Sequence, residues 1–346
     1  MLPLRTHNPA KTFLGKDDRC HESFLQFRAL YKHQSEADSD ISASQFHCLL
    51  KDDIPSASRP PQFQLEAGFF ISIARRWRYP FVFVDTEFPG TIHRSEKPFF
   101  LLSPEERYAL LKANVDDLRP IQVGITLCYT DADKSLVRLG TAAGAGDGDA
   151  GTSRFAFTWQ FDLRDFDVRL HPHAPDSVAL LESSGLDLSR TRRMGVPSTW
   201  IARLLLDSGL IGRGSAAKWV AFQGGYDFAI LLKSFLQLTM PPWLARTPAR
   251  LPPTLSGFSA FTRCLFGSGI YDVKCLMRSC DGLFGGLERV AEQLRVKRAA
   301  GKTHQAGSDS LLTCQVFFKI TELYFRGRTF GGCEDQIPFK GLLFGL

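Results

Sequence analysis

Two acidic residues, Asp85 and Glu87, stand at the end of an apolar run in the segment FVFVDTEFPG, residues 81–90. The run has the composition of a β-strand, and alternate residues of a strand point to the same face, so both carboxylates face one side of a sheet. Such neighbours repel each other unless a cation neutralises them, and Mg²⁺ takes oxygen ligands from one or two carboxylates. A solvated surface pair is the commoner fate of an isolated Asp-x-Glu, so the interpretation depends on later residues.

Three later residues complete a possible constellation. Asp227 follows a short strand and a Gly-Gly turn, in the first turn of an expected helix. Asp309 lies at the start of another expected helix, and His304 lies in the loop before it. An acid at a helix start is also favoured by the helix dipole alone, and a loop histidine is usually solvated. Ends of elements are nevertheless where loops and termini build functional sites.

Four carboxylates and a histidine fit one type of chemistry, the hydrolysis of a phosphodiester by two metal ions. Two Mg²⁺ or Mn²⁺ ions about 3.5–4 Å apart hold the phosphodiester, activate water and stabilise the leaving oxygen. About four carboxylates are needed to bind both ions. A histidine can act as general base because its ordinary pKa lies near neutral pH.

Composition sets broad limits on the fold and on the partners. The chain has 346 residues, 44% of them hydrophobic, which suffices for one large domain or two ordinary ones. Its formal net charge of +6 suits a polyanionic partner but carries little weight alone. We expect no membrane association, because neither a signal peptide core nor an apolar run of roughly 18 residues is found.

The pattern of apolar residues predicts an α/β fold with a mixed central sheet flanked by helices. Residues 1–64 are expected to form a partly disordered extension, and residues 65–346 one domain with a Gly-rich loop at 140–153. Ser103 and Ser308 are predicted to cap helices. Strands are expected at 81–88, 121–130, 154–163 and 218–223, and helices at 65–79, 103–119, 196–211, 224–236, 286–296 and 307–325. Residues 269–279 are expected to form a short strand or extended segment followed by a helix.

Four motifs occur in a characteristic order: VDTEFPG, GYDF, YDVK and HQAGSDSLLT. From about Leu65 onward the chain resembles the DEDDh exonucleases of the carbon-catabolite-repressor-associated-factor type, which are poly(A)-specific deadenylases. The resemblance implies a ribonuclease H-like exonuclease fold with a five-stranded sheet. It implies two divalent cations, Mg²⁺ or Mn²⁺, and removal of poly(A) from the 3′ end with release of AMP. By motif, the metal ligands are Asp85, Glu87, Asp227 and Asp309, and His304 is the histidine of the DEDDh class, expected to orient or deprotonate the attacking water.

The same resemblance implies partners and a cellular location. They are poly(A) RNA and subunits of the CCR4-NOT complex, namely the Not scaffold and a second deadenylase. By itself the protein is expected to be a monomer, present in the nucleus and the cytoplasm. Two other functions stay open: a related DEDD exonuclease acting on other RNA or DNA, and an adaptor subunit of the deadenylase complex.

Several residues near the motifs allow two interpretations each. Asp272 and Lys274 either touch metal-bound water or a phosphate, or serve helix capping and solvation. Phe88 either stacks on a base or belongs to the core. The segment Phe222-Gln223-Gly224-Gly225 departs from the family pattern, which has His-Ser or Asn-Ser before GYDF. This change affects the expected substrate contacts more than the expected metal ligands.

Overall fold

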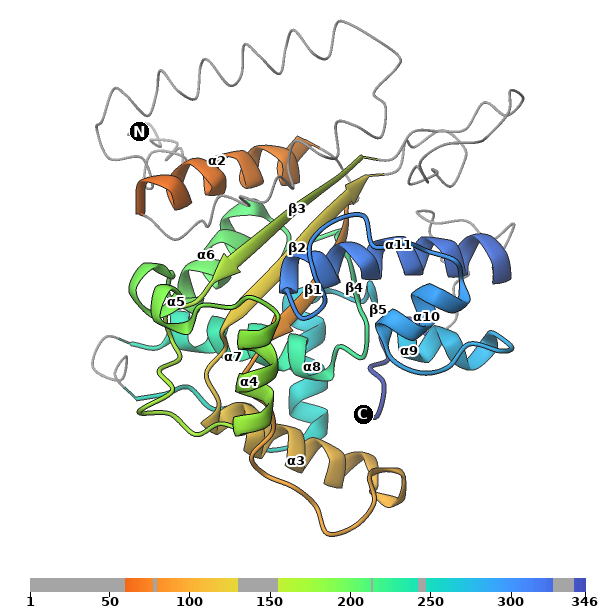
Figure 1. Ribbon diagram of the computed structural model, residues 1–346, viewed down its shortest axis with the longest axis horizontal. Coiled ribbons are helices and arrows are strands. Elements are labelled where there is room, and N and C mark those ends of the chain that lie inside the picture. The colour runs from red at the N-terminus through yellow and green to blue at the C-terminus, as the bar shows by residue number, and fades with distance from the viewer. Residues whose placement is uncertain (1–59, 77–79, 130–154, 213, 242–246, 326–338) are drawn as a thin grey trace, which may run out of the picture.

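A mixed β-sheet forms the centre of the protein (Figure 1). Its strands are β1 (Phe81–Glu87), β2 (Gln122–Tyr129), β3 (Phe155–Asp162), β4 (Lys218–Ala221) and β5 (Ile270–Asp272), in the spatial order β3-β2-β1-β4-β5. β1 pairs antiparallel with β2 and parallel with β4. β2 pairs antiparallel with β3, and β4 parallel with β5. The predicted mixed sheet is confirmed in this computed structural model, which describes residues 60–76, 80–129, 155–212, 214–241, 247–325 and 339–346.

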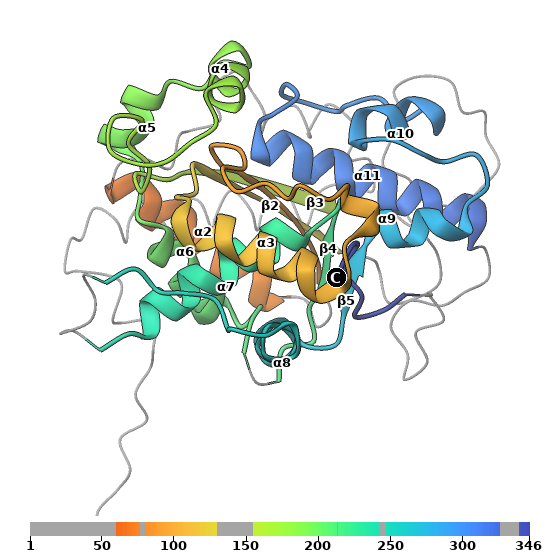
Figure 2. The same cartoon turned by 90° about the horizontal axis from the view of Figure 1, so that it is seen from below.

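Helices cover both faces of the sheet (Figure 2). One layer contains α2 (Pro60–Arg76), α3 (Pro104–Asp117), α6 (Ser198–Ser208), α7 (Gly225–Thr239) and α8 (Leu255–Phe266). The opposite layer contains α9 (Val273–Leu276), α10 (Leu287–Gln293) and the long α11 (Ala306–Tyr324), with α4 (Pro175–Ser183) and α5 (Leu188–Met194) on the same side. Short 3₁₀ helices lie at Phe99–Leu101 and Met277–Ser279.

The central strand β1 sends alternate side chains into the two layers. Val84 is buried in the cluster that includes residues of α2 and α7. Phe83 faces the other way and packs on Phe317 of α11, with ring centroids 5.6 Å apart. Asp85 and Glu87 continue the Phe83 face by the same alternation. The strand therefore carries both carboxylates toward α11.

A glycine allows the start of α11 to lie directly against the sheet. Gly124 of β2 is the register partner of Asp85. A Cβ atom at this position would lie 1.9 Å from the Ala306 carbonyl oxygen and 2.4 Å from the Gly307 nitrogen. Only a glycine fits this approach, which brings the first turn of α11 beside Asp85.

The predicted strands and helices are present in the structure, but some of their boundaries differ, one predicted cap is wrong and three helices were not predicted. Ser103 caps α3 as expected, and it forms a capping box with Glu106. The prediction for Ser308 was wrong: the N-cap of α11 is Gln305, without a side-chain bond, and Ser308 lies inside the helix. α2 begins at Pro60 rather than at Leu65. Helices α4, α5 and α8 were not predicted, because their apolar patterns are short and the surrounding sequence is rich in Pro, Gly and Ser.

Two predictions concern residues outside the described part of the chain. These are the extension, of which residues 1–59 are not described, and the Gly-rich loop at 140–153. The division into an extension and one domain stays a prediction. Within the described residues, no helix combines the length and the apolar composition needed to span a membrane.

Candidate active site

The five predicted site residues converge at the end of β1. The half-buried Asp85 lies near Asp227, Glu87 and Asp309, and the charges of these three acids help to raise its pKa. Ligand atoms of Glu87, His304 and Asp309 all lie within 4.8 Å of one another. Three elements distant in sequence, β1, α7 and α11, therefore bring their acids to one place, and the loop before α11 adds the histidine.

Asp227 is held by the hydroxyl of Thr86, the residue between Asp85 and Glu87. Thr86 points from β1 toward α7, and its Oγ1 donates to Asp227 Oδ1 over 2.6 Å. Both side chains are buried, with 6% of each exposed. Because β4 runs parallel to β1, α7 begins at the same edge of the sheet at which β1 ends. This contact fixes Asp227 relative to the strand that carries Asp85 and Glu87.

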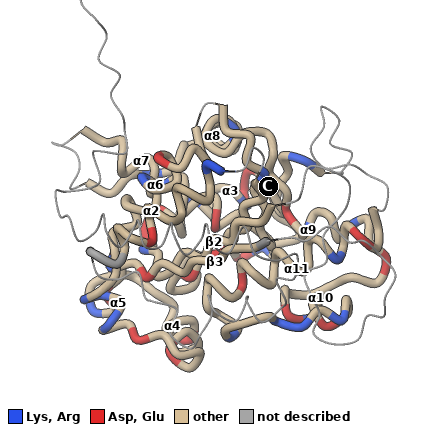
Figure 3. The backbone as a smooth tube through the Cα atoms, turned by 90° about the horizontal axis from the view of Figure 1, so that it is seen from above, with Lys and Arg blue, Asp and Glu red and all other residues tan. Residues whose placement is uncertain are grey.

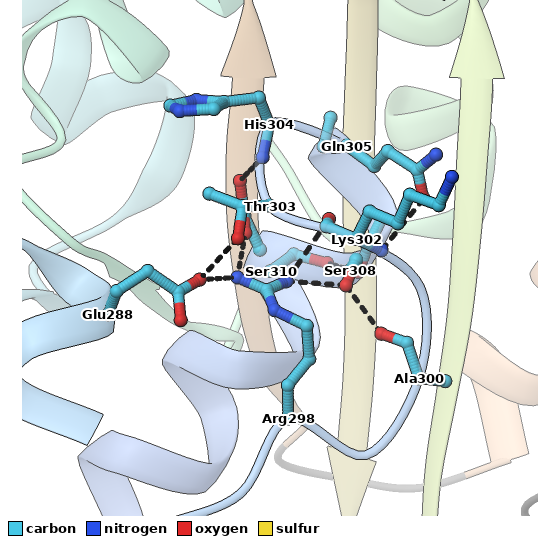
Figure 4. A network of polar contacts seen from close by, with 12 residues as sticks. Glu288, Arg298, Ala300, Lys302, Thr303, His304, Gln305, Ser308 and Ser310 are labelled. Carbon is cyan, nitrogen blue, oxygen red and sulfur yellow. Dashed lines mark hydrogen bonds and ion pairs between the residues drawn. The ribbon is translucent and has the colours of Figure 1, made fainter. Parts of the chain in front are cut away.

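Asp309 and His304 are joined by a hydrogen bond from the backbone of the histidine. The N–H of His304 donates to Asp309 Oδ2 over 3.0 Å (Figure 4). His304 has a left-handed backbone, with a φ of 60°, and so has Gly301 earlier in the same loop. The tight loop thus turns the imidazole toward the acids while its main chain binds one of them.

Burial and crowding raise the pKa values of the four acids. Burial is the main cause for Asp85, whose pKa lies well above its usual range, and the charges of Asp227, Glu87 and Asp309 add to it. Burial and the charges of Asp309 and Asp227 raise the pKa of Glu87 to about 8. Burial also raises the pKa of Asp227 to about 7. For Asp309 burial outweighs the opposing effect of Arg298. The ionised cluster is therefore unfavourable without bound cations.

Asp272 has a structural role. Its side chain is completely buried and accepts four backbone hydrogen bonds, from the N–H groups of Gln223, Gly224, Lys274 and Phe344, at 2.9–3.0 Å. Of the two interpretations left open by the sequence, capping is the one observed, and the carboxylate is fully engaged. It ties β5 and the segment 339–346 to the loop that precedes Asp227.

Lys274 and Phe88 are engaged by aromatic rings. The Lys274 ammonium lies 5.5 Å from the ring centre of Phe222 and 5.6 Å from that of Phe344. Phe88 stacks on Tyr226 with centroids 4.9 Å apart and packs against the core. Phe88 also lines a pocket of about 220 Å³. The core interpretation of Phe88 therefore agrees with its packing.

Arg298 is a charged residue of the site that was not predicted from the sequence. Arg298 donates through Nη2 to Asp309 Oδ1 over 2.6 Å and also pairs with Glu288 (Figure 4). It belongs to none of the four motifs. Basic and acidic residues are spread over many elements of the fold, including α10 beside this site (Figure 3). One more arginine therefore does not stand out in the sequence as a residue of the site.

A mixed sheet that gathers buried acids and a histidine at the end of its central strand defines a nuclease of ribonuclease H-like fold. Comparison with known proteins specifies the family. A family model described as CAF1 family ribonuclease matches residues 77–198. The Arabidopsis thaliana protein named probable CCR4-associated factor 1 homolog 7 is 37% identical over 268 residues, which are 78% of this chain and 85% of that protein. The chain therefore belongs to the CAF1 family of ribonucleases.

Fission yeast provides a relative known both as a sequence and as a structure. The Schizosaccharomyces pombe protein named poly(A) ribonuclease pop2 is 34% identical over 266 residues, covering 76% of this chain and 68% of that protein. The structure of S. pombe Pop2p, described as its Mg²⁺ and Mn²⁺ bound form, matches with a TM-score of 0.61 and 32% identity, covering 82% of this chain and 96% of that one.

A second structural neighbour shares the fold. Yeast CAF1, co-crystallized with the NOT1 MIF4G domain, matches with a TM-score of 0.52 and 20% identity over 81% of this chain and 92% of that one.

The raised pKa values predict how pH and metal affect stability. The acids bind protons more tightly in the folded, metal-free protein than in the unfolded chain, so the folded state holds more protons between about pH 4 and pH 8. The free energy of unfolding should therefore fall as pH rises through this window. Mn²⁺ should raise the melting temperature strongly at pH 8 and little at pH 5, because it competes with protons for the same oxygens.

Thermal melts with a chelator or with Mn²⁺, at a series of pH values, measure this effect. Asp281→Asn removes an exposed carboxylate of the same type elsewhere and serves as the control. It should keep the Mn²⁺ effect and the pH slope. A metal-free protein whose stability rises steadily from pH 5 to pH 8 would contradict the expectation.

Proposed function

We propose that the protein is a 3′-to-5′ exoribonuclease that shortens poly(A) with two divalent cations and releases AMP. The observation that carries this proposal is the convergence of Asp85, Glu87, Asp227 and Asp309 with His304 in a member of a ribonuclease family. The preference for poly(A) is supported by the similarity to the S. pombe protein named poly(A) ribonuclease pop2.

The donor set of this site fits Mg²⁺ or Mn²⁺. Both prefer carboxylate oxygens, and the crowded acids need positive charge to ionise together. We propose Asp85, Glu87, Asp227 and Asp309 as the ligands, in line with the Mg²⁺ and Mn²⁺ bound form of S. pombe Pop2p. When bound, the cations neutralise the phosphodiester and make the attacking water more acidic.

The chain's own residues then orient the reactants and move a proton. The carboxylates fix the site on two helices and a strand, which are rigid supports. His304 accepts the proton of the attacking water, and its backbone bond to Asp309 keeps it near the acids. Water adds to phosphorus, and the bond to the 3′ oxygen of the preceding nucleotide breaks, so that this oxygen leaves with the bonding electrons and takes a proton from solvent. The products are AMP and an RNA one nucleotide shorter with a free 3′ hydroxyl.

Asp85→Asn tests the role of the first acid. This change keeps the size of the side chain but removes a charge, so we expect turnover of labelled oligo(A) to fall at least about 100-fold. The metal-free protein should melt at the same or a higher temperature at neutral pH, because the change relieves repulsion. Asp281→Asn should retain wild-type turnover. A fully active Asp85→Asn protein would refute the assignment.

Substrate choice is tested separately with oligonucleotides of equal length. We expect oligo(A) to be degraded faster than oligo(U) and oligo(dA), with product bands shortening one nucleotide at a time from the 3′ end. Equal rates on all three would indicate a related exonuclease without adenine preference. Internal cuts on a substrate blocked at its 3′ end would exclude an exonuclease.

We also propose that the protein works as a catalytic subunit on a Not scaffold. Its relatives include proteins named CCR4-associated factors, and a yeast CAF1 of the same fold has been co-crystallized with the NOT1 MIF4G domain. Co-purification with the scaffold domain of its own species tests the association. Asp85→Asn should bind that domain normally yet fail to restore deadenylation in cells lacking the protein. Full rescue by this variant would favour an adaptor role.

A further inference from the structure

Arg298 forms ion pairs with two acids, Asp309 of the candidate site and Glu288, and Figure 4 shows it beside Glu288. Its guanidinium reaches Asp309 Oδ1 over 2.6 Å on one side and pairs with Glu288 on the other. The exposed fraction of the side chain is 15% for Arg298, 11% for Asp309 and 45% for Glu288. The inner ion pair is therefore shielded from water, while the outer one remains partly solvated.

The same side chain also holds the loop that carries the histidine. Arg298 Nη1 donates to Ser308 Oγ in α11 and, over 3.4 Å, to the carbonyl of Lys302 in the loop. Thr303 Oγ1 donates to the same Glu288 oxygen that pairs with Arg298, over 3.0 Å. The guanidinium thus connects α10, the loop and the first turn of α11 in a single network.

Both oxygens of Asp309 already have donors within the chain. Oδ1 accepts from Arg298, and Oδ2 accepts from the backbone N–H of His304. A carboxylate offers about four lone-pair positions, so it retains room for a cation. A fixed positive charge at 2.6 Å from one oxygen nevertheless opposes the approach of a second positive charge.

We propose that Arg298 is an internal counter-cation that competes with a divalent cation for Asp309 and positions the His304 loop, with Glu288 moderating its charge. This proposal rests on the proposed function, because it requires a cation at Asp309. Arg298 acts through Asp309 and His304 and is a positioning residue. Its positive charge reduces the repulsion among the acids before a metal ion binds, and for the same reason it lowers the affinity of the site for the metal ion.

Opposite changes of metal affinity test the proposal. Arg298→Gln removes the competing charge, so Mn²⁺ should bind about five to ten times more tightly. The loop is freed at the same time, so kcat on oligo(A) should fall at least about tenfold. Glu288→Gln leaves the whole guanidinium charge on Asp309 and should weaken Mn²⁺ binding about threefold. Isothermal titration with Mn²⁺ alone gives the affinity, and steady-state assays give kcat and KM.

Two further variants separate charge from shape. Arg298→Lys keeps the charge but loses the fork that bridges two acids, so its Mn²⁺ affinity should stay near wild type while kcat lies between those of wild type and Arg298→Gln. Lys297→Gln removes the same charge from an exposed neighbouring side chain and should change neither quantity. A residue with a purely structural role would instead lower affinity and turnover together.

The proposal is overturned if folded Arg298→Gln binds Mn²⁺ no more tightly than wild type, or if the Arg298 and Glu288 variants shift affinity in the same direction. Circular dichroism melts establish folding. If Arg298→Gln does not fold, an unchanged or tighter affinity in Glu288→Gln overturns the proposal, and a weaker affinity supports it. Failure of the proposed function is a different result: the wild-type protein would then bind no Mn²⁺ and leave oligo(A) intact.

Discussion

The partial burial of four carboxylates, together with their mutual repulsion, is the constraint on which the rest of the active site depends. β1, α7 and α11 bring four acids together where burial already disfavours charge, and the pKa of Glu87 reaches about 8 in consequence. Such a cluster persists in a folded protein only if the surrounding structure is stable enough to hold it. It becomes favourable when positive charge arrives, which links the fold of this region to cation binding.

The positions of the acids follow from contacts that leave little freedom. Gly124 lets α11 start against the sheet beside Asp85, and Thr86 binds Asp227 from the opposite face of β1. The number of backbone donors separates two kinds of buried aspartate here. Asp272 accepts four N–H groups and is fully used in holding the chain. Asp227 accepts from the Thr86 hydroxyl and from two backbone groups, those of Thr86 and of Asp227 itself, and it lies among the other acids.

This distinction also explains how the chain can depart from its family before GYDF. The clamp on Asp272 uses the main-chain N–H groups of Gln223 and Gly224, which almost any residue type supplies. Conformation and space restrict the choice more than side-chain chemistry does. Gln223 is left-handed, with a φ of 63°, and a Cβ at Gly224 would lie 2.5 Å from that of Ala221. The main chain of this loop, more than its side chains, therefore holds the segment that precedes Asp227.

Local patterns in the chain were enough to predict the strands and helices that carry the acids, because apolar periodicity and the Ser103 cap are local signals. The sequence also supplied the candidate residues, since Asp85, Glu87, Asp227, His304 and Asp309 stand in motifs that occur in a fixed order. It did not determine the position of Arg298 or the role of Asp272, which looked equally suited to phosphate contact and to capping. It also predicted Ser308 wrongly as a helix cap, whereas the Ser308 hydroxyl contacts Arg298 and Ala300. Their partners lie far away along the chain or across a loop, as with Asp272 and Phe344. Only the tertiary structure decides such pairs, because hydrogen bonds and ion pairs depend on distance in space, and no local pattern records that distance.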